Sequence, residues 1–164
     1  MANKKKTTRE VGEYKIKINN VLLKSPEIRN LLTDGVGDKI NKESIISFKG
    51  HVMSHLFIDD TIKDRSTYIF YDVVVPGFRT HTKNIHIIVY AICHRDILEN
   101  INIDNTSYCG NRADVLSQMI ENTLLDESIV NEFGIGNLEL IDLDIYNSTT
   151  FYGRIMTFEV YNFR

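Results

Sequence analysis

The chain has 164 residues, of which 43% are apolar and 25% charged. This is the length of one domain, which buries roughly 70% of the unfolded chain's surface on folding, and the composition excludes disordered and fibrous proteins. The net charge is −3, but residues 1–17 carry +4 and residues 18–164 carry −7. We therefore expect a basic, flexible arm at residues 1–9, attached to an acidic domain at residues 10–164.

Helices are predicted for the first part of this domain. A helix is expected over residues 10–24, because four apolar side chains recur there at helical spacing: Tyr14, Ile18, Val21 and Leu22. Ser25 followed by Pro26 is a typical helix opening, which predicts a second short helix over residues 26–32. Residues 34–62 lack a sustained period, so we expect a long loop there.

Two strands are predicted next. Residues 67–75 and 84–92 are rich in β-branched and aromatic side chains, and the stretch 76–83 between them predicts a hairpin with a long tip. Both runs are apolar at odd and even positions alike. Because successive side chains of a strand point to opposite faces, something must cover each face of this hairpin.

The C-terminal part of the chain predicts a helix and a closing hairpin. Asn111 is a good N-cap for a helix over residues 112–125, and a shorter helix is expected over residues 128–133. One face of the longer helix is apolar: Val115, Leu116, Met119, Ile120 and Leu124. Strands over residues 138–146 and 151–163 are joined by four residues, a connection of hairpin length.

Alternation in the closing hairpin indicates two unlike faces. In its first strand Ile141, Leu143 and Ile145 alternate with Asp142 and Asp144, so we expect one face in the core and the other toward solvent or a partner. No internal repeat or linker divides the chain. The sequence thus predicts one α+β domain, a single antiparallel or mixed sheet of about four main strands with helices on one face, in the order α-β-β-α-β-β.

Candidate metal ligands occur in the predicted loop. His51 and His55 are four residues apart, a spacing that can share a metal on a helix, but the glutamate of a zinc-protease motif is absent. Asp59 and Asp60 could add carboxylates for Mg²⁺. A metal-dependent nuclease or hydrolase that uses these four residues is one hypothesis, and solvated loop side chains are the simpler one. We predict no catalytic residue, no metal and no cofactor.

The cysteines and the apolar segments indicate the cellular compartment in which the protein is expected. Cys93 and Cys109 form neither a disulfide framework nor a metal-ligand spacing, so we expect reduced thiols in a reducing compartment. No segment approaches the ~20 apolar residues of a bilayer span, and the start of the chain has no apolar run. The sequence therefore predicts an intracellular protein without a membrane partner.

The arrangement of these segments is similar to that of a known family. The N-terminal helix, the long-tipped hairpin, the helix RADVLSQMIENTLLD and the closing hairpin LELIDLDIYN with FYGRIMTFEVYNF resemble the tail terminator and tail-completion (neck) proteins of long-tailed bacteriophages. The resemblance covers residues 10–164 and rests on architecture. It implies a virion protein of the tail or neck, made in the host cytoplasm, whose copies form a ring, commonly a hexamer. Such a ring caps the tail tube and docks with the head-completion proteins.

The resemblance also frames the functional hypotheses. We expect a structural virion protein and no enzyme, with genome DNA passing through the ring without sequence-specific binding, which an acidic body permits. The alternatives are another head-tail connector, a minor tail structural protein, or an adaptor whose strands extend a partner's sheet. Candidate subunit or partner contacts lie in the arm, the first hairpin and the last strand: Lys4, Lys5, Lys6, Tyr71, Val73, Val75, Phe78, Arg79, His81, Arg154 and Tyr161.

Overall fold

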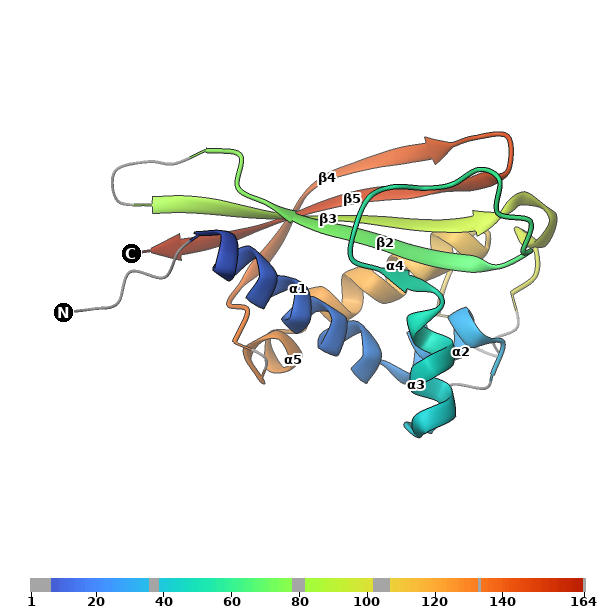
Figure 1. Cartoon of the computed structure of the whole chain (residues 1–164), viewed down its shortest axis with the longest axis horizontal. Helices are drawn as coiled ribbons and strands as arrows, with labels where there is room; N and C mark the ends of the chain where they lie inside the picture. Colours follow the sequence, from blue (N-terminus) through green and yellow to red (C-terminus); the bar gives the residue numbers. More distant parts are fainter. Residues whose placement is uncertain (1–6, 36–38, 78–81, 102–106, 133, 164) are drawn as a thin grey trace.

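A mixed sheet covered by helices on one face forms the molecule (Figure 1). The computed structural model describes residues 7–35, 39–77, 82–101, 107–132 and 134–163, with the backbone alone at 82 and 161–163. The elements in chain order are α1 (Thr7–Lys24), α2 (Pro26–Thr33), α3 (Lys42–Lys49), β1 (Val52–Met53), β2 (Thr67–Val74), β3 (Thr82–His94), the short helix η2 (Arg95–Ile97), α4 (Arg112–Leu125), α5 (Glu127–Glu132), β4 (Leu138–Asn147) and β5 (Phe151–Phe163). The predicted α+β class is confirmed.

The first two helices form as their sequence patterns predict. All four apolar residues of the predicted stripe on α1 are buried. The helix begins at Thr7, so residues 7–9 of the predicted flexible arm are helical, and residues 1–6 lie outside the described part of the chain. The Ser25 hydroxyl accepts a hydrogen bond from the Ile28 N–H at 3.4 Å and caps α2, which carries Pro26 in its first turn.

The predicted loop at residues 34–62 is wrong in its central part. Residues 42–49 form α3, which begins with a reciprocal capping box between Asn41 and Ser44. Val52 and Met53 then form β1, which pairs in parallel with β2. A two-turn helix with one large buried side chain, Phe48, shows too little of the helical period for the sequence pattern to indicate it.

The strand order in the sheet is β1-β2-β3-β5-β4. All neighbours except β1 and β2 are antiparallel, and residues directly opposite each other include Ile69 and Ala91, and Ile87 and Phe158. Because opposite residues share a face, this register sorts the side chains into a helix-side face and an outer face. Figure 1 shows α1, α2, α4 and α5 together on the helix-side face.

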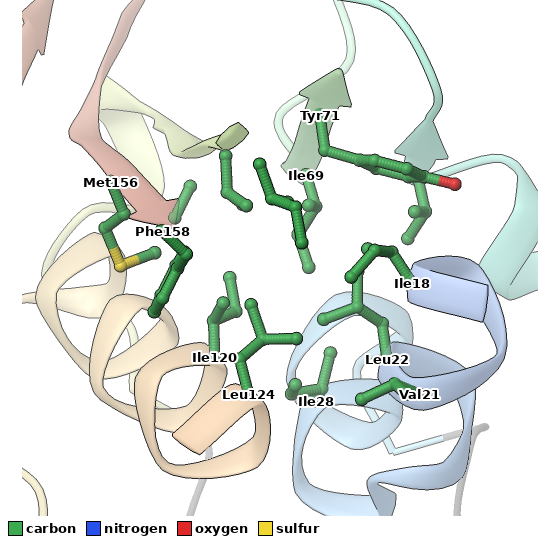
Figure 2. Packing of buried hydrophobic residues seen from close by; sticks show 14 of the residues in the cluster. Ile18, Val21, Leu22, Ile28, Ile69, Tyr71, Ile120, Leu124, Met156 and Phe158 are labelled. Carbon is green, nitrogen blue, oxygen red and sulfur yellow. The ribbon is translucent and has the colours of Figure 1, made fainter. Parts of the chain in front are cut away.

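The main core lies between this face and the helices (Figure 2). Ile18 and Leu22 of α1 meet Ile69 of β2, while Leu124 of α4 lies near Phe158 of β5. All of these side chains are at most 1% exposed. The core therefore joins the N-terminal helices, α4 and the three central strands in one cluster.

A second, smaller apolar cluster lies on the outer face. Tyr68, Phe70, Ile92 and Phe151 are buried there, and apolar side chains of the segment 54–66 pack against them: Leu56, Ile58 and Ile62. Figure 1 shows this segment crossing the sheet on the side away from the helices. The prediction that both faces of the hairpin 67–92 are covered is confirmed at this end of the sheet, and the cover is another segment of the same chain.

The elements after β3 agree with the predicted pattern. α4 and β5 have the predicted bounds, β4 is one residue longer than predicted, and α5 begins and ends one residue earlier. Asn111 caps α4 through a capping box with Asp114. No helix within the described ranges is long and apolar enough to cross a bilayer.

Tyr71 ties the sheet to α1 through its side chain. The ring is 2% exposed, and the hydroxyl donates a hydrogen bond to the Lys15 carbonyl at 2.9 Å. Burial, and secondly the charge of Asp72, raises the pKa of Tyr71 to about 12. The ordinary pKa of tyrosine is about 10, so the folded protein retains this proton over a range in which the unfolded chain loses it.

A pH dependence of stability follows from Tyr71. The stabilisation is complete below about pH 10 and is lost as the pH rises toward about 12, because the unfolded chain then binds fewer protons than the folded protein. We expect the free energy of unfolding to fall by up to roughly 3 kcal/mol over this interval from this group. Urea unfolding of the wild type and of the Tyr71→Phe variant at several pH values measures it. If the free energy of unfolding depended on pH equally in both proteins, the effect could not be assigned to Tyr71.

Candidate assembly surface

The predicted contacts on β2 lie in the core. Tyr71 and Val73 are 2% and 3% exposed and point toward the helices. Val75, just beyond the end of β2, is partly buried and packs against the same core. The prediction that Tyr71 and Val73 contact another subunit is therefore wrong, because the chain's own helices already cover them. Alternation alone does not tell which of the two apolar faces of a strand meets the helices.

Arg154 has its carboxylate partner within the same chain. Its Nε lies 2.8 Å from Oδ1 of Asp114, and the guanidinium is 5.9 Å from the centroid of the Tyr152 ring. The hydrogen bond that Arg154 donates to the Asp114 carboxylate raises the pKa of Arg154. Because Asp114 also belongs to the capping box of α4, the pair fixes the start of that helix to β5. Arg154 therefore has an ion-pair partner within its own chain, and its contact with another subunit stays a prediction.

The other predicted contacts are only partly placed. Tyr161 lies in β5, where its backbone is opposite Asn84 of β3. The remaining six lie outside the described residues: Lys4, Lys5, Lys6, Phe78, Arg79 and His81.

The candidate metal ligands have structural partners. Nδ1 of His51 is 2.9 Å from the Thr67 carbonyl, and its ring stacks on Tyr68. Asp59 accepts hydrogen bonds from the backbone N–H and hydroxyl of Thr61, and these lower the pKa of Asp59. Asp60 accepts a hydrogen bond from the Ser148 hydroxyl at 2.8 Å, which holds the segment 54–66 to the turn before β5. In the part of the chain that the structure describes, no three His, Cys, Asp or Glu side chains are grouped to hold a metal.

A polar cluster occupies the outer face near the end of β5. Oε1 of Glu159 accepts a hydrogen bond from Nδ2 of Asn84 at 2.6 Å and lies 3.2 Å from Nε2 of His86. The Glu159 residue is 8% exposed, so these contacts compensate a carboxylate that is largely removed from water. The three side chains come from the neighbouring strands β3 and β5, and the cluster links those strands across the outer face.

The apolar residues of β4 are the main departure from the predicted core. Leu138 and Leu140 pack against the core, but a register shift follows Leu140. Beyond it Ile141, Leu143 and Ile145 are 43%, 56% and 52% exposed, which contradicts their prediction as a core face. Leu143 and Ile145 lie opposite Met156 and Arg154 and thus share the helix-side face, but they lie at the end of the sheet, where the helices do not cover them.

The backbone of β4 is open on one side. The strand ends the order of the sheet, and the Ile145 N–H bonds to Oδ1 of the preceding Asp144 at 2.7 Å instead of to β5. N–H groups two residues apart point the same way, so that of Leu143 is also directed away from β5. An exposed apolar edge strand is a site at which other chains associate. We name residues Ile141–Ile145 the β4 edge.

The opposite edge of the sheet is better protected. β1 covers two residues of β2, and beyond it the Val73 N–H bonds to the preceding Asp72 carboxylate at 2.8 Å, the same contact that Ile145 makes in β4. Asp72 in turn forms an ion pair with Lys15 of α1, at 2.7 Å. A shallow pocket of about 240 Å³ lies beside this edge, lined by Lys15, Ile16, Asn19, Val52, Ser54 and Tyr71. Among the described strands, β4 therefore presents the longer open edge.

Comparison with known protein families gives a match over most of the chain. The protein-family model YomW matches residues 21–160, from within α1 to the last residue of β5 whose side chain is described. Comparison with curated proteins and comparison with solved structures each gave no match. The matched range includes α3, the segment 54–66 and the β4 edge.

Proposed function

The chain belongs to the YomW family, a phage-derived family of the Bacillus prophage type, and from this membership we propose that it is a structural protein of the phage particle. The proposed role is that of a ring-forming tail terminator or neck component, which joins the tail tube to the head-completion proteins. In this role the protein acts by assembly and not by catalysis. It belongs to the virion tail or neck and is made in the host cytoplasm.

The β4 edge is the observation that supports this proposal most directly. Its three aliphatic side chains are each more than two-fifths exposed, in a strand with an open backbone edge. Exposed apolar edges are costly in a protein that works as a monomer, because they promote association with other chains. A head-to-tail contact between unlike surfaces closes into a ring when the rotation between copies permits it. A ring subunit therefore accounts for the exposure.

Charge supports the passage of DNA through such a ring. The chain carries a net charge of −3, and residues 18–164 carry −7. Affinity for nucleic acid comes largely from Lys and Arg side chains that neutralise phosphates, so an acidic wall repels the DNA backbone and lets it slide. Sequence-specific binding of the genome is not part of the proposed function.

The proposal predicts an oligomer. We expect purified protein to form rings, commonly hexamers, either alone or when tail tubes of a phage that encodes a YomW-family protein are present. Light scattering over a range of concentrations measures the mass of the assembly, and negative-stain images show whether it is closed. A chain that stays monomeric in both settings, and does not bind the tube ends, would contradict the proposal.

A further inference from the structure

The helix layer leaves a place vacant under the β4 edge. Leu140 is still packed against the core, whereas Leu143 and Ile145, on the same face, are more than half exposed. The cover provided by α4 and α5 thus ends between Leu140 and Leu143. A further helix lying beside α4 under β4 would bury these two side chains, since burial of aliphatic side chains in such a layer is favourable.

The strand that borders this place is acidic. Residues 138–147 contain three acidic residues and no basic one: Glu139, Asp142 and Asp144. All three are exposed, and no ion pair to them occurs within the described parts of the chain. Asp142 and Asp144 point to the outer face. Because β4 is the last strand of the sheet, a long basic side chain that approaches from the helix side can extend around this strand to their carboxylates.

α3 carries a complementary surface. Lys42, Ile46 and Lys49 follow one another at i, i+4 and i+7, which places them on one stripe of the helix, and all three are exposed. Ile46 is 63% exposed, whereas Phe48 is fully buried against the chain's own core. Residues 39–49 contain three lysines and one acidic residue, Glu43, so the segment has a net charge of +2. Neither Lys42 nor Lys49 forms an ion pair with any described residue.

The two surfaces lie on opposite sides of the molecule. α3 contacts β1, at one end of the strand order, and the β4 edge is the other end. Figure 1 shows α3 below the sheet and β4 at the upper margin of the sheet. One chain therefore cannot bring its own α3 to its own β4 edge, but a second copy can. Each surface is apolar at its centre and carries charge of the opposite sign to the other.

We propose that α3 of one copy fills the vacant place under the β4 edge of the next copy. Ile46 packs there against Leu143 and Ile145, while Lys42 and Lys49 face Asp142 and Asp144. The contact joins unlike surfaces, so each copy uses one surface toward each neighbour, as a ring or a filament requires. The inference rests on the proposed function, because it assumes that copies of this chain associate.

Charge reversal tests this pairing. One variant carries Asp142→Lys and Asp144→Lys, and a second carries Lys42→Glu and Lys49→Glu. Each variant alone opposes like charges at every contact, so we expect its association constant to fall at least about tenfold. An equimolar mixture of the two opposes unlike charges at every contact, so it should assemble into particles of the wild-type size in which the two variants alternate.

A matched control reverses two charges elsewhere. The control variant carries Lys63→Glu and Glu99→Lys. Both residues are exposed and lie outside the two surfaces, so this variant should assemble like the wild type. Circular dichroism and thermal melts establish that each variant folds. Folded variants that assemble alone as well as the wild type, or a mixture that stays dissociated, would overturn the pairing while the oligomer of the proposed function stands. A monomeric wild type, with and without tail tubes, would overturn both.

Discussion

Replacing Arg112 with methionine is expected to lower the free energy of unfolding by about 3–5 kcal/mol. The side chain is 2% exposed and donates four hydrogen bonds to groups far apart in sequence. Its acceptors are the Thr67 hydroxyl at 2.6 Å, the Asn100 carbonyl at 2.8 Å, the Asp34 carboxylate at 2.9 Å and the Leu31 carbonyl. Methionine fills much of the space but leaves the buried acceptors without a donor.

The loss should come mainly from buried neutral acceptors. The side chain of Asp34 is 65% exposed and can return to water, but the Thr67 residue is fully buried and stays without a donor. Urea unfolding measures the difference. Arg65→Met is the matched control, because Arg65 is 70% exposed and its pair with Asp96 is screened by solvent, so it should change stability by less than about 1 kcal/mol. If the two substitutions lowered the free energy of unfolding equally, the hydrogen bonds of Arg112 could not be the source of the stabilisation.

The role of Arg112 could not be predicted from the sequence alone. An arginine at the first position of a predicted helix is ordinarily a solvated charge, and no local pattern marks this one as different. Its partners lie in α2, in β2 and after η2, so the site exists only once those segments are packed together. The neighbouring N-cap Asn111 was predictable, because a cap depends on residues within one helical turn.

The same distinction explains which elements were predictable. α4 and β5 are long and strongly patterned, and their predicted bounds match the structure. α3 and β1 are short and were predicted as loop. The apolar residues on both faces of β2 did indicate that each face is covered, but nothing local shows that the segment 54–66 is the cover.

The candidate surface was predictable only in part. Alternation in β4 was visible in the sequence, and it separated Leu143 and Ile145 from Asp142 and Asp144, but the face that it predicted as core is exposed. It did not show that Leu143 and Ile145 lie beyond the last helix, because that depends on the position of β4 at the end of the sheet. The stripe of Lys42, Ile46 and Lys49 can be recognised as an exposed surface only when residues 42–49 are known to form a helix that buries its other side.

Replacing Gly153 with alanine is expected to destabilise the protein by about 3 kcal/mol, the upper part of the range for overpacking. Gly153 lies in β5, opposite Ile92 of β3 and Tyr146 of β4. A Cβ atom at this position would overlap the Ala91 carbonyl oxygen and lie 2.8 Å from the Ile92 Cα. Both atoms belong to the backbone of a central strand, so no side chain can rotate away, and β3 and β5 would have to separate.

Gly12→Ala is expected to have the opposite effect on the stability of the protein. Gly12 lies within α1 and is exposed, and a Cβ atom there would meet nothing within 4 Å. Alanine favours a helix interior over glycine by about 1 kcal/mol, so this variant should be more stable than the wild type. Thermal melts of the two variants compare them directly. If Gly153→Ala melted within a degree or two of the wild type, β3 and β5 could not be as close at this position as the fold requires.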